Sequence, residues 1–200
     1  SRWNMKLSYA RSFVDAPYFY RVSTTSYPGA ENLNPQYFNS LQLSSSIDFI
    51  PKKLTYEANL FYNVATDVIT LTESGYDNAG TVKTLGLEQV LRYQQKDFNL
   101  YASATYQPAL SVEYVYSVGN SNKVHNTPEF IFQLVTAKEL NFVKDLWLNL
   151  HLSYRSNQPA PYGSIMVFKD GDFYTDDYFV IKGYLLANLG LRYSFKWFSV

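Results

Sequence analysis

Apolar and polar residues alternate with a period of two along much of this 200-residue chain, and no other feature constrains its fold as strongly. The clearest alternation lies at residues 3–9, 54–62, 146–154 and 185–197. Strict alternation gives a β-strand one apolar face and one polar face. Less contrasted strands are predicted at about residues 36–50, 84–95, 97–112 and 128–140. No segment shows the 3.6-residue apolar stripe of a long helix, so we expect an all-β fold of about eight strands.

The segment that begins at Phe98 predicts an unusually long strand. Apolar residues keep one parity from Phe98 to Tyr116, with Pro108 between them. Proline is tolerated at a strand edge or at a bulge. We therefore expect the register to continue unchanged across Pro108.

Short and long connections alternate between the predicted strands. Short turns are expected at residues 51–53, 96–97 and 141–145. Long connections, rich in Tyr, Pro, Gly, Asn and Ser, are expected near residues 14–36, 67–83, 111–127 and 157–178. An antiparallel up-and-down meander with its short turns at one end and its long loops at the other is typical of a transmembrane β-barrel. A soluble, lipocalin-like barrel would also alternate, but with its apolar face inward and without a need for long loops on one rim.

Charge placement supports an apolar face that contacts lipid. The apolar parity of the four clearest strands carries no charged residue. Charges take the opposite parity at Lys6, Glu57, Arg155, Arg192 and Lys196. A Lys or Arg that faces lipid at mid-membrane costs about 2–4 kcal/mol, which explains this segregation. Lys138 is on the apolar parity of its strand, but it lies beside a short turn, where its side chain can reach the interface.

Composition excludes several classes of protein. The chain has 17 basic and 17 acidic residues and no cysteine, so it lacks the basic stripe of a nucleic-acid binder and cannot form disulfides or thiolate metal sites. No apolar run is long enough for a membrane-spanning helix. No signal peptide begins the sequence, so an export signal would have to lie upstream of Ser1.

Several short motifs, in order, resemble those of TonB-dependent outer-membrane receptors. They are LSYARSFVDAPY at 7–18, GAENLNPQ at 29–36, ANLFYN at 58–63 with DVI at 67–69, YDNAG at 76–80 leading to LGLE at 85–88, and NTP at 126–128. Each motif is weak alone, and their order over nearly the whole chain carries the resemblance. The family's barrels have about 22 strands. The resemblance therefore implies that residues 1–200 are one segment of such a barrel domain, without the plug domain, the TonB box or the final strands.

The resemblance also implies a function. Family members reside in the outer membrane of Gram-negative bacteria and actively take up scarce nutrients such as iron–siderophore complexes. The expected partners are the TonB complex through a plug and TonB box, outer-membrane lipid, a small nutrient ligand and, in some members, a surface lipoprotein. The alternatives are a passive porin or adhesin built as a small β-barrel, and a soluble ligand-binding barrel.

Candidate ligand-binding residues are aromatic or basic and lie in the long loops or on the polar strand faces. They are Arg11, Tyr18, Tyr20, Arg21, Tyr27, Tyr76, Arg155 and Tyr162. Aromatic side chains can grip a ligand with a small loss of entropy, and arginines can attract an anionic ligand. The tyrosines could equally pack the loops against each other, and the arginines could pair within the barrel wall.

Other polar residues give no sign of catalysis or of a cofactor. His151 has the polar parity of its strand and is expected to line the lumen, whereas His125 lies in a loop. Haem receptors of the family carry a histidine in the segment that corresponds to 18–31, and none is present here. The acidic residues at 170–177 lack EF-hand spacing. The sequence has no nucleophile elbow or phosphate loop, so we expect neither an enzyme nor a bound metal or cofactor.

Overall fold

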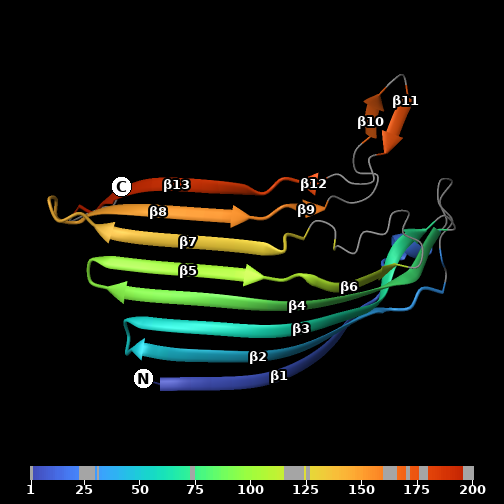
Figure 1. Ribbon diagram of the computed structural model, residues 1–200, viewed down its shortest axis with the longest axis horizontal. Helices are drawn as coiled ribbons and strands as arrows, with labels where there is room; N and C mark the ends of the chain where they lie inside the picture. The colour runs from blue at the N-terminus through green and yellow to red at the C-terminus, as the bar shows by residue number, and fades with distance from the viewer. Residues whose placement is uncertain are drawn as a thin grey trace.

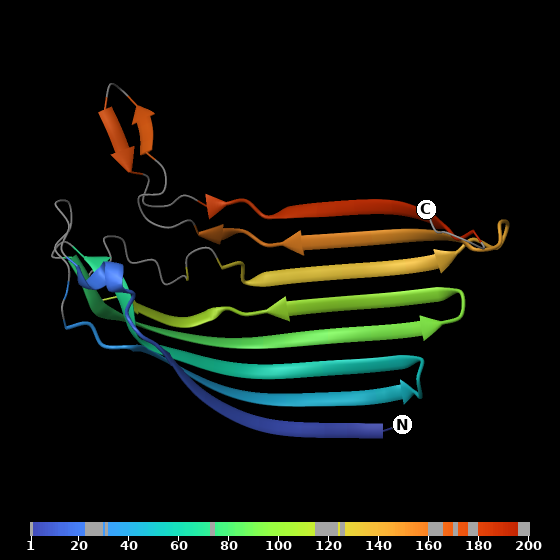
Figure 2. The same ribbon diagram turned by 180° about the vertical axis from the view of Figure 1, so that it is seen from behind.

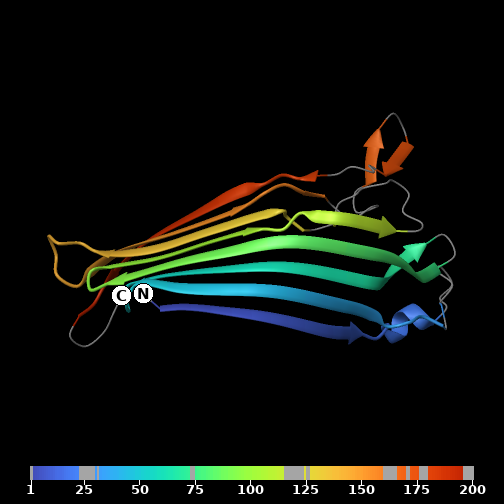
Figure 3. The same ribbon diagram turned by 60° about the horizontal axis from the view of Figure 1, so that its bottom comes forward.

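The computed structural model describes residues 2–22, 30, 32–72, 75–114, 124, 127–159, 166–169, 172–175 and 180–195. Long antiparallel strands lie side by side in one open sheet, with the short turns at one end and the long connections at the other (Figure 1). The strands follow a curved surface rather than a plane (Figure 3). The all-β prediction is confirmed. Among the described residues, no helix is long and apolar enough to cross a membrane.

The main sheet has the order β1-β2-β3-β4-β5-β7-β8-β13. Its strands are β1 (Arg2–Val14), β2 (Gln36–Ile50), β3 (Leu54–Thr72), β4 (Gly75–Gln95), β5 (Phe98–Tyr106), β7 (Phe130–Glu139), β8 (Leu146–Arg155) and β13 (Tyr184–Tyr193). The strand β6 (Ala109–Tyr114) continues beside β4 beyond the end of β5. Small elements at the loop end are α1 (Tyr18–Arg21), β9 (Gln158–Pro159), β10 (Met166–Lys169), β11 (Asp172–Thr175) and β12 (Val180–Ile181). β9 pairs with β12, and β10 pairs with β11.

The two edges of the sheet are open. Among the described strands, β1 pairs only with β2, and β13 pairs only with β8. Nearly every residue of both edge strands is exposed on both faces. An unpaired strand edge presents a row of free N–H and C=O groups, which a closed barrel removes. The open sheet is thus a wall segment of a larger barrel.

The predicted long connection at residues 67–83 is wrong. The chain instead continues as a hairpin, because β3 runs to Thr72 and β4 starts at Gly75. Asp67 has a φ of 56°, and the register shifts on both sides of Val68, which marks a β-bulge. A bulge absorbs the turn-favouring residues of this segment without ending the pairing.

The register continues unchanged across Pro108, as predicted, because Leu87 pairs with Tyr106 and Thr84 with Ala109. The single parity predicted as far as Tyr116 is wrong, because the register shifts two residues after the proline. Thr84 pairs with Ala109, whereas Lys83 pairs with Ser111, so Leu110 is the extra residue of a bulge. The bulge reverses the parity of the strand. Val112 therefore lies opposite Val82 on the polar side of the sheet and is buried there.

One face of the sheet is built from apolar cross-strand rows. A complete row runs in register through Leu7, Leu43, Leu60, Leu87, Tyr106 and Phe130. These side chains contact no second layer, and Leu7 is 70% exposed. An apolar face of this extent without a covering layer is what a membrane-spanning strand presents to lipid. We call it the outer face, and the opposite face the inner face.

Candidate ligand-binding face and loop-end site

The inner face is mainly polar, although β7 presents Ile131, Val135 and Ala137 to it. One of its rows contains Lys6, Ser44, Asn59, Glu88 and Thr105, and continues through Ile131 to Arg155 on β8. The prediction that His151 has the polar parity agrees with its place on this face, opposite Asn188. The alternation in the sequence thus gathers most polar side chains on one face, because the strands are paired in register.

Hydrogen bonds and one ion pair connect the inner face between strands β2, β3 and β4. Arg92 forms an ion pair with Glu57. The Ser44 hydroxyl donates to the Asn59 Oδ1 at 2.9 Å, and the Asn59 Nδ2 donates to the Glu88 Oε2 at 3.1 Å. Paired side chains of this kind fix the wall without neutralising every group on it.

A hollow of about 290 Å³ lies over this network. The serine side chains of β2 are small and leave room for it. The polar side chains around the hollow are Asn4, Lys6, Ser44, Ser46, Glu57, Asn59 and Glu88. Lys6 has no carboxylate within ion-pair distance among the described residues. The hollow therefore offers one ammonium group, two carboxylates and several neutral donors and acceptors to the lumen.

The candidate residue Arg155 lies on the inner face at the loop end of β8. It pairs through its backbone with Tyr184 of β13 and with Ile131 of β7, and it is exposed. Arg192 and Arg92 also lie on this face, over the rings of Trp147 and Tyr101, each at 5.5 Å. No carboxylate within ion-pair distance holds Arg155 in the described part of the chain, so its guanidinium is free to meet an anionic group.

The position of Arg11 requires a correction. Its place in β1 puts it on the same face as Tyr9 and Phe13, which is the outer face. Its guanidinium lies 4.9 Å from the centre of the Tyr37 ring. The prediction that Arg11 meets a ligand in the lumen is wrong, because the two-residue period gives it the parity of the apolar set of β1.

The tyrosines of the first long loop mainly pack the loop onto the sheet. The Tyr20 ring stacks on the Tyr76 ring at 4.1 Å between centroids, which ties α1 to β4. Figure 2 shows α1 beside the loop ends of these strands. Arg21 donates to the Asp15 carboxylate at 2.7 Å. Tyr18, by contrast, is 81% exposed and keeps its ring available.

An asparagine that was not among the candidate residues anchors this loop. The Asn78 side chain accepts from the Asn34 backbone N–H at 2.7 Å and donates to the Asn34 carbonyl at 3.0 Å. Its amide also donates to the Asp67 carbonyl at 2.8 Å. Leu33 beside it is only 5% exposed. The motifs at 29–36 and 76–80 were the available signal, since their Asn residues meet here.

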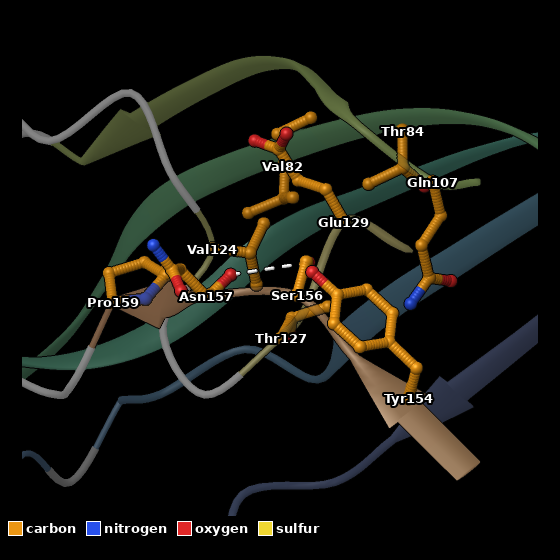
Figure 4. A pocket seen from close by; sticks show the side chains of 11 residues that line it. Val82, Thr84, Gln107, Val124, Thr127, Glu129, Tyr154, Ser156, Asn157 and Pro159 are labelled. Carbon is orange, nitrogen blue, oxygen red and sulfur yellow. Dashed lines mark hydrogen bonds between the residues drawn. The ribbon is translucent and has the colours of Figure 1, made fainter. Parts of the chain in front are cut away.

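A cavity of about 360 Å³ opens at the loop end, lined by residues of β4 and β6, of the chain before β7 and of the end of β8 (Figure 4). Its polar lining consists of Thr84, Gln107, Thr127, Glu129, Tyr154, Ser156 and Asn157. The chain before β7 closes it on one side, because the Gln107 N–H donates to the Glu129 carbonyl at 2.7 Å. Hydroxyl, amide and carboxylate groups around such a space can bind a small polar molecule.

Several sequence predictions fall outside the described residues. They are the candidate ligand residues Tyr27 and Tyr162, the loop residue His125, and Asp170, Asp176 and Asp177 of the acidic segment. Among the described residues, no group of three or more His, Asp or Glu side chains is arranged to hold a metal ion.

An open wall with an apolar outer face, a mainly polar inner face and an elaborated loop end is the architecture of a segment of a transmembrane β-barrel. The family model described as "TonB dependent receptor-like, beta-barrel" matches residues 1–200. This chain belongs to that family of β-barrels. No curated protein sequence matches it significantly.

Solved structures show the same fold. The ferric-catecholate import receptor Fiu of E. coli superposes with a TM-score of 0.73 at 19% identity, over 96% of this chain and 26% of Fiu. The siderophore receptor PiuA of Acinetobacter baumannii gives 0.68 at 16%, over 96% and 27%. The pyoverdine receptor FpvA of Pseudomonas aeruginosa gives 0.68 at 15%, again over 96% and 27%. The chain thus spans about a quarter of the length of these structures.

Proposed function

We propose that this chain forms part of the wall of an outer-membrane active transporter that takes up a scarce nutrient such as an iron–siderophore complex. The observation that carries the proposal is the mainly polar inner face, which extends along the strands to the loop-end cavity. A ligand captured at the loop end then has donors, acceptors and charges along its way through the barrel. The printed names of Fiu, PiuA and FpvA, which are import or siderophore receptors, support this choice of cargo.

A passive small barrel, the alternative function, is less well supported. Eight strands can close into a barrel only if the first and last strands pair. Here β1 and β13 do not pair with each other, and the sheet curves without closing. The open edges fit a wall that continues into further strands, which is the geometry that a plugged transporter requires. The family comprises receptors for transport rather than enzymes, in line with this proposal.

The geometry divides the proposed ligand-binding residues into those whose side chains are free to touch the cargo and those that hold the loop in shape. Tyr18 and Arg155 keep their side chains free, so we place them among the residues that touch the cargo. Tyr20, Tyr76 and Arg21 instead hold the loop in shape and act on the cargo through it. TonB, reached through a plug, supplies the energy in this proposal, and outer-membrane lipid surrounds the barrel. A surface lipoprotein that caps the loops is a further partner in this proposal.

The test is energised uptake by whole cells. A bacterial strain that lacks the whole protein is compared with the same strain complemented by it, and uptake of radiolabelled iron bound to siderophores is followed. We expect saturable uptake that stops when TonB is deleted or the inner-membrane proton gradient is dissipated. Uptake that persists without TonB would show a passive barrel instead. Growth on a panel of siderophores, cobalamin and haem then identifies the cargo.

A further inference from the structure

The cavity at the loop end has an unbalanced negative charge. Among the described residues that line it, only Glu129 is charged. No Lys, Arg or His side chain in the described part of the chain lies within ion-pair distance of its carboxylate. Arg155 pairs with Ile131, two residues further along the same face, and does not reach Glu129 either. The carboxylate is therefore available to a positively charged group that enters the cavity.

The cavity lies beside an unpaired strand edge. Of the described strands, only β4 pairs with β6, which lines the cavity through Ala109. Gln107 joins this edge to the chain before β7, because its backbone N–H donates to the Glu129 carbonyl at 2.7 Å and its Nε2 donates to the Pro128 carbonyl at 3.3 Å. The two bonds hold the backbone at Glu129 in place. They leave the Gln107 Oε1 as an acceptor without a donor among the described residues.

The end of β8 forms a further side of the cavity (Figure 4). The Ser156 Oγ accepts from the Phe130 N–H at 3.0 Å and donates to the Asn157 carbonyl at 3.3 Å. The Asn157 Oδ1 in turn accepts from the Gly183 N–H at 2.6 Å. Gly183 is packed so closely that an added Cβ would lie 2.7 Å from the Arg155 carbonyl oxygen. This side of the cavity is thus held in shape by the protein alone, which lowers the cost of binding.

The other polar groups of the cavity are not used by the fold. The Glu129 carboxylate and the hydroxyls of Thr84 and Tyr154 form no hydrogen bond with other described residues. With the Gln107 Oε1, they offer a ligand three neutral acceptors and one negatively charged acceptor. Apolar side chains complete the lining, and they are Val82, Ala109, Val124 and Pro159. A volume of about 360 Å³ is near the lower end of the range for ligand pockets, so the cavity suits one small ring.

We propose that this cavity binds a small hydroxylated ammonium compound of the amino-sugar class. Glu129 receives the ammonium group in a charge-assisted hydrogen bond. Thr84, Gln107 and Tyr154 bind the hydroxyls, and the apolar lining contacts the C–H groups of the ring. An anionic ligand is disfavoured, because it would be repelled by Glu129. The inference rests on the proposed function only in that the cavity lies at the loop end, where that function places the capture of the cargo.

Ligand-observed NMR with the whole protein, purified in a mild detergent, tests the proposal. Glucosamine is titrated at about pH 6, where its amine is protonated, and glucose and N-acetylglucosamine serve as uncharged probes. A hydrogen bond to a charged group changes an equilibrium constant by about tenfold or more. We therefore expect glucosamine to bind at least about tenfold more tightly than either uncharged sugar. Similar affinities of the unaltered protein for the three sugars, or no detectable binding of glucosamine, would overturn the proposal without any variant.

The variant Glu129→Gln removes the charge and keeps the size of the side chain. It should weaken glucosamine binding about tenfold and leave glucose binding within about twofold, so that the preference disappears. Glu113→Gln is the matched control, because Glu113 is an exposed carboxylate of β6 outside the cavity lining, and it should keep the preference. Ala109→Phe places a ring in the cavity and should abolish glucosamine binding. A preference that survives in Glu129→Gln, or binding that survives in Ala109→Phe, would overturn the proposal.

Failure of this inference and failure of the proposed function give different results. TonB-dependent uptake by cells, together with no preference for glucosamine in the purified protein, would reject the amino-sugar site alone. Selective binding of glucosamine by a protein that supports no TonB-dependent uptake would reject the transport role and keep the site.

Discussion

The two faces of the sheet differ in how many polar side chains they carry and in how these side chains are hydrogen-bonded. On the inner face, polar side chains are frequent, and some are hydrogen-bonded to one another across strands, as in Ser44–Asn59–Glu88. On the outer face, polar groups are few, and two of those in the apolar band receive a bond from an aromatic neighbour. The Trp3 indole N–H donates to the Ser45 Oγ at 2.8 Å, and the Tyr56 hydroxyl donates to the Gln89 Oε1 at 2.8 Å.

This difference indicates the surroundings of each face, which are hydrocarbon at the outer face and water at the inner face. In hydrocarbon no water can satisfy a polar group, so a partner must be supplied by the protein. In a water-filled lumen an unpaired group is solvated, and spare polar groups remain for a ligand. A substitution should therefore have an effect that depends on the face it alters, even at adjacent residues.

The largest effect is expected for a charge placed in the middle of the outer face. Leu60 lies in the central apolar row and Asn59 lies beside it on the inner face. Leu60→Arg should lower the free energy of unfolding by about 2–4 kcal/mol, because the guanidinium must enter hydrocarbon. Asn59→Arg, facing Glu88, should change it by less than about 1 kcal/mol. Urea titration of the whole protein refolded into liposomes measures both, and equal losses would contradict the assignment of the faces.

A close contact on the inner face gives the next effect. A Cβ added to Gly86 would lie 2.1 Å from the Phe61 Cζ, so the ring must move. Phe61 is 7% exposed, and forcing it out of place should cost about 1–3 kcal/mol in Gly86→Ala. Gly190 has no heavy atom within 4 Å of such a Cβ, so Gly190→Ala is the matched control.

A double-mutant cycle tests whether that contact is responsible. In a Phe61→Ala background the ring is absent, so Gly86→Ala should have almost no cost there. The same liposome titration gives the coupling between the two positions. A cost of Gly86→Ala that is independent of residue 61 would place the strain in the backbone instead.

The alternation in the sequence predicted the strands well because it is a local property. Strand pairing itself depends on partners, and this is where predictions failed. The bulge at Leu110 leaves the apolar pattern intact while it reverses the faces, so parity alone misplaces Val112. The bulge at Asp67 similarly hides a hairpin behind residues that usually form a turn.

The candidate site was predicted less well than the fold. Arg11 has the apolar parity of β1, but a general expectation that arginines face the lumen placed it inside. Tyr20 and Tyr76 were correctly grouped as loop aromatics, yet only their stacking distance shows that they contact each other. Asn78 was visible only within a motif, because its bonds to Asn34 join residues that are far apart in the sequence.

A smaller effect is expected when one of the outer-face hydrogen bonds is removed. Tyr56→Phe deletes the hydroxyl that donates to Gln89 and leaves an amide acceptor in the apolar band. Side-chain hydrogen bonds within a membrane are worth about 0.6 kcal/mol on average and at most about 1.7. We therefore expect a loss of about 1 kcal/mol in the free energy of unfolding. Adding Gln89→Leu removes the acceptor and should restore most of the stability, and failure to do so would show that Tyr56 acts by packing alone.

The smallest effect concerns the turn at the other end of the sheet and depends on pH. The hydrogen bond from Lys138 lowers the pKa of Asp97 below its ordinary value of 3.8. Because the folded pKa lies below the unfolded one, the stabilisation is fully present above the unfolded pKa and is lost as the pH falls through the folded pKa. Unfolding titrations between neutral pH and about pH 3 should thus show a small acid-dependent loss of stability that Asp97→Asn lacks. An identical pH dependence in both proteins would mean that the Lys138–Asp97 pair adds nothing to the stability of this end of the sheet.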